Sequence, residues 1–104
     1  MQERFNQPTV NSIVAVGTSS VKVSERGNSP QDKRIFMVLR NTSPNATDII
    51  TVRFGASAAV VNEGIVLRQY DSFVDSDGES YECYQGDINA ICATGTGQLS
   101  LSER

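Results

Sequence analysis

Two short runs of β-branched and aromatic residues, joined by a loop of turn-forming residues, constrain the fold of this chain more than any other feature. The runs span residues 34–40 and 49–55, and Thr-Ser-Pro-Asn-Ala-Thr-Asp occupies 42–48 between them. Neither run has the apolar spacing of an amphipathic helix. Similar runs recur as far as residue 103, each bounded by Gly, Asn, Asp or Ser, which is typical of strands. We therefore expect an all-β protein.

The run at 34–40 is apolar on both of its faces. Ile35, Met37 and Leu39 share one face, whereas Phe36 and Val38 share the other, because side chains alternate along a strand. Burying a large apolar side chain is worth roughly 1.5–3 kcal/mol, so both faces should be covered. We expect a central strand with the opposite sheet on one face and a neighbouring subunit on the other.

The spacing of the remaining runs predicts eight or nine short strands in a single antiparallel β-sandwich of jelly-roll type. The expected domain comprises residues 12–104, preceded by an extended arm at 1–11. The run at 79–84 should pair with 88–93 through a turn at 85–87, and 56–61 should be a strand or a loop. Further strands are expected at 13–16, 21–24, 64–67, 72–75 and 98–102.

The composition argues against an enzyme and against several classes of partner. The 104 residues include no histidine, the commonest general base, and no nucleophile motif, so we expect neither catalysis nor a cofactor. No apolar run approaches the roughly 20 residues that span a bilayer. The first residues lack the order of a signal peptide, and the basic residues do not interleave with aromatics. We expect no membrane or nucleic-acid partner, and synthesis in a reducing cytoplasm.

Charge is distributed unevenly along the chain. Up to residue 54 there are seven basic and four acidic residues, or +3, and from residue 55 there are two basic and eight acidic residues, or −6. Such charges commonly belong to solvated loops and edges. The alternative is head-to-tail complementarity between copies in an assembly, in which opposite charges fix orientation.

Few residues suggest a chemical site. Asp75, Asp77 and Glu79 alternate with small residues, as at the start of a calcium loop, but the twelfth position counted from Asp75 is Gly86 and not the Glu of an EF-hand. A calcium site without the EF-hand pattern remains an alternative to a solvated β-turn. Cys83 and its only possible partner, Cys92, are expected to be buried free thiols because a cross-strand disulfide would be strained.

Large apolar residues outside the expected core positions are candidates for an interface, since aromatic side chains are enriched at interface centres. The alternative interpretation of these residues is that most of them are core or half-buried strand residues. The interface candidates are Phe5, Phe36, Val38, Tyr70 and Tyr84.

The order of strands and turns resembles the small β-sandwich virion proteins of tailed bacteriophages, such as capsid decoration (cement) proteins and head-fibre or spike bases. The resemblance rests on Val-Leu-Arg-Asn at 38–41 before a Ser/Pro/Asn loop, Phe-Gly at 54–55 and Gly-Ile-Val-Leu at 64–67. It continues with Asp-Ser-Phe at 71–73, Gly-Asp-Ile-Asn-Ala-Ile at 86–91 and Leu-Ser-Leu-Ser-Glu at 99–103, and so covers residues 13–103.

The resemblance implies a virion protein, made in the host cytoplasm, that binds the major capsid protein on the outer surface of the head. It also implies a homo-oligomer, for which we expect a trimer, and a terminal arm that grips a neighbour. The alternative is a head-fibre, spike or tail module that binds a host receptor or carbohydrate, using the loops at 41–48 and 68–80.

Overall fold

Eight strands make up the regular structure of the chain in a computed structural model, which describes residues 9–25 and 33–104. Within those residues the chain forms strands, turns and loops and no helix. The all-β prediction is therefore confirmed. The strands are β1 (Val10–Val16), β2 (Val21–Ser24), β3 (Phe36–Asn41), β4 (Ile50–Phe54), β5 (Ile65–Leu67), β6 (Ser72–Ser76), β7 (Ile88–Cys92) and β8 (Gly97–Glu103).

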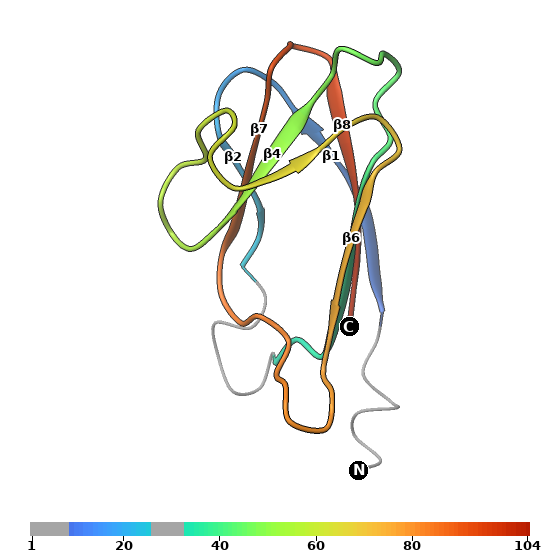
Figure 1. Cartoon of the computed structure of the whole chain (residues 1–104), viewed down its shortest axis with the longest axis vertical. Coiled ribbons are helices and arrows are strands. Elements are labelled where there is room, and N and C mark those ends of the chain that lie inside the picture. Colours follow the sequence, from blue (N-terminus) through green and yellow to red (C-terminus); the bar gives the residue numbers. More distant parts are fainter. Residues whose placement is uncertain (1–8, 26–32) are drawn as a thin grey trace.

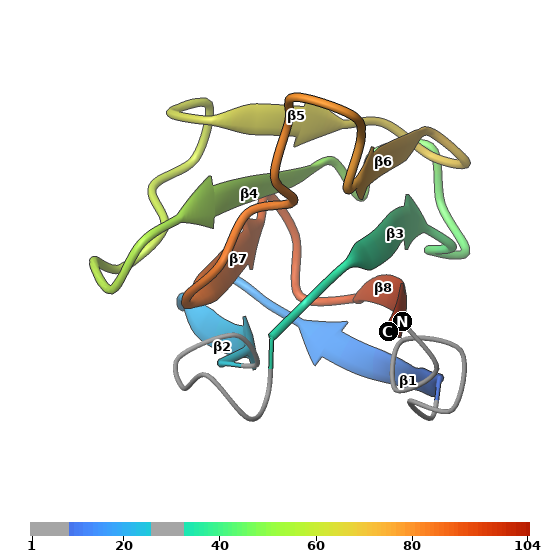
Figure 2. The ribbon, with the colours of Figure 1, turned by 90° about the horizontal axis from the view of Figure 1, so that it is seen from below.

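The strands form two antiparallel sheets of four strands each, which lie face to face as a sandwich (Figure 1). Sheet A has the order β1-β8-β3-β6 and sheet B the order β2-β7-β4-β5. Seen from one end in Figure 2, sheet A and sheet B form the two layers, with β1 beside β2 at one open side and β6 beside β5 at the other. β3 is an inner strand of sheet A, as its two apolar faces predict.

The core lies between the inner faces of the sheets. Alternate residues of each strand point inwards, as the period of two requires. Sheet A contributes Val16, Met37, Leu39, Leu99 and Leu101, and sheet B contributes Ile50, Val52, Leu67, Ile88, Ala90 and Cys92. Phe36 and Val38 do not belong to this cluster, and Ile35, which precedes β3, is only half-buried.

Part of the outer face of sheet B, over β4 and β7, is covered by the chain itself. The loop between β4 and β5 folds back over it, and Asn89 donates from Nδ2 to the carbonyls of Gly55 and Ser57 at 2.8 and 3.1 Å. Thr51 accepts a hydrogen bond from the backbone N–H of Asn62 at 3.0 Å. Thr51 and Asn89 point away from the core and are nevertheless buried, so this loop acts as a third layer.

Gly64 allows that loop to return to the sheet. Its φ is +146°, and a Cβ at this position would lie 2.4 Å from the carbonyl oxygen of Val52. A side chain would therefore meet the backbone of β4 at a distance that real Cβ atoms do not adopt, in a conformation that favours glycine.

Two of the expected boundaries differ from the structure. The predicted hairpin between 79–84 and 88–93 is wrong, because residues 77–87 form an irregular loop and β7 pairs with β2 and β4 instead. β1 begins at Val10, so the last two residues assigned to the arm, Val10 and Asn11, belong to a strand paired with β8. Residues 1–8 of the expected arm lie outside the described residues.

No helix in the described part of the chain is long and apolar enough to cross a membrane.

Candidate functional site

Within residues 9–25 and 33–104, the outer face of sheet A has no covering loop and carries several exposed apolar side chains. The strand register places its outward side chains in rows across the four strands. Ile13 and Val74, on the two edge strands, are 69 % and 59 % exposed, and Phe36 and Val38 are partly exposed between them. The other outward positions are Asn11, Ala15, Arg40, Ser72, Ser76, Gln98, Ser100 and Ser102.

One corner of this face combines an exposed aromatic residue with a cation. Asp71 donates its backbone N–H to the carbonyl of Arg68 at 2.9 Å, which closes a β-turn between β5 and β6. Only its third residue, Tyr70, has a positive φ (+68°), as in a type II turn. The Tyr70 ring is 59 % exposed, and the guanidinium of Arg40 lies 5.8 Å from its centre.

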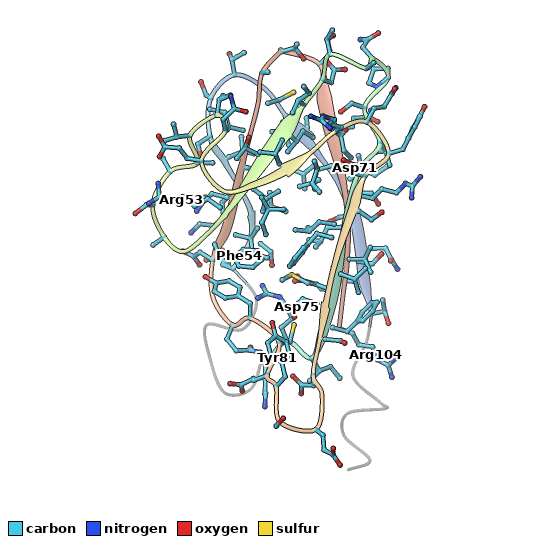
Figure 3. All side chains as sticks on the ribbon, in the orientation of Figure 1. Arg53, Phe54, Asp71, Asp75, Tyr81 and Arg104 are labelled. Carbon is cyan, nitrogen blue, oxygen red and sulfur yellow. The ribbon has the colours of Figure 1, made fainter. Side chains whose placement is uncertain are left out.

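The structure brings together three of the five interface candidates. Phe36, Val38 and Tyr70 all lie on or beside the outer face of sheet A. Tyr84 instead lies against the core, where its ring stacks on Phe54 at 4.4 Å (Figure 3 labels Phe54) and its hydroxyl donates to the carbonyl of Asp87 at 2.9 Å. The core interpretation holds for Tyr84, and Phe5 lies outside the described residues.

The calcium candidates do not form a group of ligands. Asp75 is buried and accepts a hydrogen bond from the backbone N–H of Tyr84 at 2.9 Å, and Asp77 accepts one from the N–H of Cys83 at the same distance. Glu79 is exposed. Among residues 9–25 and 33–104, no three Asp, Glu or Cys side chains are close enough together to hold a metal ion. The two aspartates thus fix the backbone of the loop between β6 and β7.

Two groups in this loop titrate away from their ordinary range. A hydrogen bond to the Asp75 carboxylate is the main cause that raises the pKa of Tyr81 above its usual value. Burial raises the pKa of the Cys83 thiol to about 12, and the negative charge of Asp75 adds to the effect. Cys83 and Cys92 are both buried and free, which confirms the prediction for the thiols. At neutral pH the Cys83 thiol therefore stays protonated and is a poor nucleophile.

A buried ion pair ties the same loop to sheet A. Arg34, fully buried, donates from Nε to Glu103 at 2.9 Å and from Nη2 to the hydroxyl of Ser24 at 3.1 Å. It also donates to the carbonyls of Tyr84 and Gly86 at 2.7 and 3.2 Å. Apart from the bond to Ser24, these bonds join segments at least 50 residues apart in the sequence. This pair was not predicted from the sequence, although Glu103 continues the inward alternation of Leu99 and Leu101.

A groove of about 540 Å³ opens between β1 and β2 beside this ion pair. Its ionisable side chains already have partners: Glu103 binds Arg34, and Lys22 lies 3.7 Å from Glu25 and 3.6 Å from Asp87. Both carboxylates that line the groove, Glu25 and Glu103, are therefore paired with cations of the chain itself.

A third buried carboxylate, Asp48, organises the opposite end of the sandwich. Asp48 accepts hydrogen bonds from the hydroxyls of Thr94 and Thr96, the latter at 2.7 Å, and from the backbone N–H of Asn45 at 3.1 Å. The two threonine hydroxyls lower the pKa of Asp48 below its ordinary value. Asn41 is also buried and donates to the carbonyl of Asp48 at 2.7 Å. Asp48 and Asn41 are thus buried and hold these loops together.

Comparison with known proteins identifies no relative: no protein-family model matches the chain, and no curated protein or solved structure is significantly similar to it. The functional argument therefore depends on the geometry of the described residues. The outer face of sheet A is the only surface among them that combines exposed apolar side chains on several strands with an exposed aromatic–arginine pair.

Proposed function

We propose that this chain is a non-enzymatic structural protein of a tailed-phage virion, namely a decoration protein that works as a homo-oligomer on the outer surface of the head. The virion assignment comes from the resemblance in strand and turn order. The assembly part of the proposal is supported by the geometry, and one observation carries it: a loop covers part of the outer face of sheet B, whereas no loop among the described residues covers the outer face of sheet A.

Exposed apolar side chains on the outer face of sheet A provide a surface to which a protein partner can bind. On this face Ile13 and Val38 lie opposite serines of the neighbouring β8, and Val74 lies opposite Val38. Removing apolar surface from water is worth roughly 25 cal/mol per Å², which makes covering the face favourable. Contiguous exposed apolar patches on soluble proteins commonly mark interaction sites.

The arrangement of the strands supports the jelly-roll assignment that we make within this proposal. β1 pairs with β8, β2 with β7, β3 with β6 and β4 with β5, all antiparallel. This is the set of pairs that results when one long antiparallel hairpin is wound into two facing sheets. The pairs β3–β8 and β4–β7 then join the windings within each sheet.

The titratable groups with shifted pKa values support a role without catalysis. Asp48 lies at one end of the sandwich, and Tyr81 and Cys83 lie at the other, so they do not converge on one cleft. Each shift has a structural cause, either hydrogen bonds within a loop or burial. Perturbed groups that act together in catalysis are expected to share a site.

The alternative, a module that binds a receptor or carbohydrate, finds less support in the geometry. It needs exposed aromatics gathered with Asn or Asp at one end of the sandwich. Tyr70 and Tyr81 are exposed at opposite ends of β6, and Asn41 and Asp48 are buried in the loop network.

Binding to phage heads tests the proposal. Purified protein is mixed with expanded heads of the encoding phage that lack it, the heads are sedimented, and bound copies are counted and imaged by electron microscopy. We expect saturable binding at symmetric positions and heads that withstand more heat. Heads that sediment without the protein, while the protein binds host cells, would contradict the decoration role.

A pair of matched variants tests the surface. Val74→Asp places a charge on the edge strand of the outer face of sheet A, and Val66→Asp does the same on the edge strand of sheet B, where Val66 is 41 % exposed. Both side chains point to solvent, so both variants should fold. We expect Val74→Asp to lose assembly and Val66→Asp to keep it. Equal behaviour of the two variants would show that the outer face of sheet A is not the binding surface.

A further inference from the structure

We propose that the partner covering the outer face of sheet A is a second copy of this chain, which inserts the tip of its β6–β7 loop there. We define the loop tip as residues 77–82. The inference rests on the proposed assembly function and specifies which two surfaces meet. It is tested on the purified chain without heads, so that its failure and the failure of head binding are separate results.

The outer face of sheet A needs a negatively charged partner. Its outward strand residues include the cation Arg40 and not a single Asp or Glu. Arg40 is exposed, and its contacts are with the hydroxyl of Ser72 at 3.3 Å and the ring of Tyr70. Among the described residues Arg40 has no carboxylate within ion-pair distance.

The loop tip supplies the complementary charge together with an aromatic side chain. It carries Asp77, Glu79 and Glu82, and of these Glu82 lies 3.1 Å from Lys33. Glu79 is exposed and forms no ion pair within the described residues. Tyr81 is 60 % exposed, and the carboxylate of Asp75 raises the pKa of its hydroxyl. Figure 3 shows Tyr81 and Asp75 near the lower end of the sandwich.

The charges also select how the copies are arranged. If the outer faces of two copies met across a two-fold axis, the interface would contain two Arg40 side chains, and the outward strand residues would supply no carboxylate. The two like charges would repel each other. When the face of one copy meets the loop tip of another, unlike charges are paired instead. The tip projects from one end of the sandwich and the face forms one side, as Figure 1 shows, so the contact is heterologous. Heterologous contacts close into rings or continue as filaments.

The backbone of Tyr70 is a separate indication that this corner binds something. Tyr70 occupies the turn position that favours Gly or Asn, with φ of +68°. The corresponding turn between Val60 and Glu63 has Asn62 there, with the same φ. A bulky side chain in this conformation is uncommon and strained. Strained residues often have a functional role, and here the strain keeps an exposed ring beside Arg40.

The size of the face predicts a weak individual contact. Four strands spaced about 4.8 Å apart make a face of roughly 20 Å by 20 Å, which is smaller than the ~800 Å² per partner of a stable interface. Each copy offers one face and one tip, so a closed ring holds every copy at two places. Binding of the second contact is then intramolecular, and assembly becomes strong once a ring closes or a surface concentrates the copies.

Charge reversal tests the pairing of the two surfaces. Arg40→Glu and Glu79→Arg/Glu82→Arg are compared with the wild type by sedimentation velocity over a range of concentrations up to millimolar, at low and moderate salt. We expect the wild type to associate, most strongly at low salt, and each variant to associate about tenfold or more weakly. A chain that carries all three changes should associate again, because both surfaces are reversed together.

The controls separate this arrangement from others. Arg53→Glu reverses an arginine on the opposite side of the molecule, which Figure 3 labels, and should leave association unchanged. A loop-tip variant that associates like the wild type, or a triple variant that fails to recover, would overturn the proposal; the first result would instead indicate face-to-face pairing. A wild-type chain that stays monomeric at millimolar concentration in low salt would also overturn it.

Tyr70→Asn distinguishes an interface role from a structural one. Asn tolerates the positive φ of this turn, so the strain is relieved while the ring is lost. We expect the thermal midpoint to stay within about 2 °C of the wild type or to rise, and self-association to weaken. A large fall in the midpoint would show that Tyr70 serves the fold, and unchanged association would remove it from the interface.

Discussion

The buried ion pair between Arg34 and Glu103 allows a sharp test of how the loop between β6 and β7 is held. Arg34→Met keeps an unbranched stem of similar length and removes the guanidinium. Glu103 then remains as a carboxylate that is 4 % exposed, with the hydroxyl of Ser24 still bonded to it. The carbonyls of Tyr84 and Gly86 lose their donor at the same time.

The expected loss is large for a domain of this size. Removing one partner of a buried pair costs about 3–5 kcal/mol, because the other charge stays buried without compensation. A buried carbonyl without a donor adds roughly 1–3 kcal/mol, part of which water recovers at the half-buried Gly86. Arg34→Met should therefore lose about 4–6 kcal/mol out of a typical total of about 5–15 kcal/mol.

A double-mutant cycle isolates the charge effect. Glu103→Leu removes the carboxylate, and Arg34→Met/Glu103→Leu removes both charges while keeping apolar volume. Replacing a buried pair by apolar residues is often close to neutral, so the double variant should be more stable than Arg34→Met alone by about 2 kcal/mol. The remaining deficit of the double variant should reflect the two carbonyls that Arg34 no longer satisfies.

Urea unfolding followed by far-ultraviolet circular dichroism measures these differences, since the chain has no tryptophan to report by fluorescence. With a slope of about 1.5 kcal/mol per M, a loss of 4 kcal/mol lowers the midpoint by almost 3 M. An Arg34→Met midpoint within about 0.5 M of the wild type would refute the account of the ion pair. A double variant less stable than either single variant would refute the charge argument specifically.

Two further predictions concern backbone fit and pH. Gly64→Ala should lower the free energy of unfolding by at least about 2 kcal/mol, because its Cβ would meet the Val52 carbonyl at a positive φ; a neutral change in urea midpoint would contradict this. Asp48 has a lowered pKa in the folded state, so its stabilising effect is present above the unfolded pKa and is lost as pH falls through the folded value. Asp48→Asn should therefore be less stable than the wild type at pH 7. The difference between their free energies of unfolding should shrink as the pH falls below about 4. A difference in free energy of unfolding that stays constant down to pH 2 would show that the charge of the Asp48 carboxylate is not involved.

Alternation along the strands was sufficient to predict most of the sandwich. The two apolar faces of 34–40 correctly predicted that β3 is an inner strand, and the outward parity of Phe36 and Val38 identified the uncovered face. This works because a strand exposes its two faces in strict alternation, so local sequence determines the parity.

The prediction of a hairpin between 79–84 and 88–93 was wrong because the backbone groups of 79–84 find their hydrogen-bonding partners elsewhere in the chain. The segment alternates like a strand, but its backbone N–H groups at Cys83 and Tyr84 donate to Asp77 and Asp75. The Tyr84 carbonyl accepts from Arg34, which is 50 residues away in the sequence. Every buried backbone group must find a partner, and side chains supply partners here that no local pattern reveals. The same long separation concealed the ion pair of Arg34 with Glu103.

The stability of the loop and the proposed function of its tip depend on the same bonds. Arg34, Asp75 and Asp77 hold the backbone at residues 83–86, immediately after the tip. A tip fixed in this way loses little conformational freedom when it binds, which lowers the entropic cost of a small contact. The proposed interface is too small to offset the entropy of ordering a flexible loop in addition to binding it. The buried charges of Arg34, Asp75 and Asp77 order the loop before binding, and this makes a weak, specific contact between copies feasible.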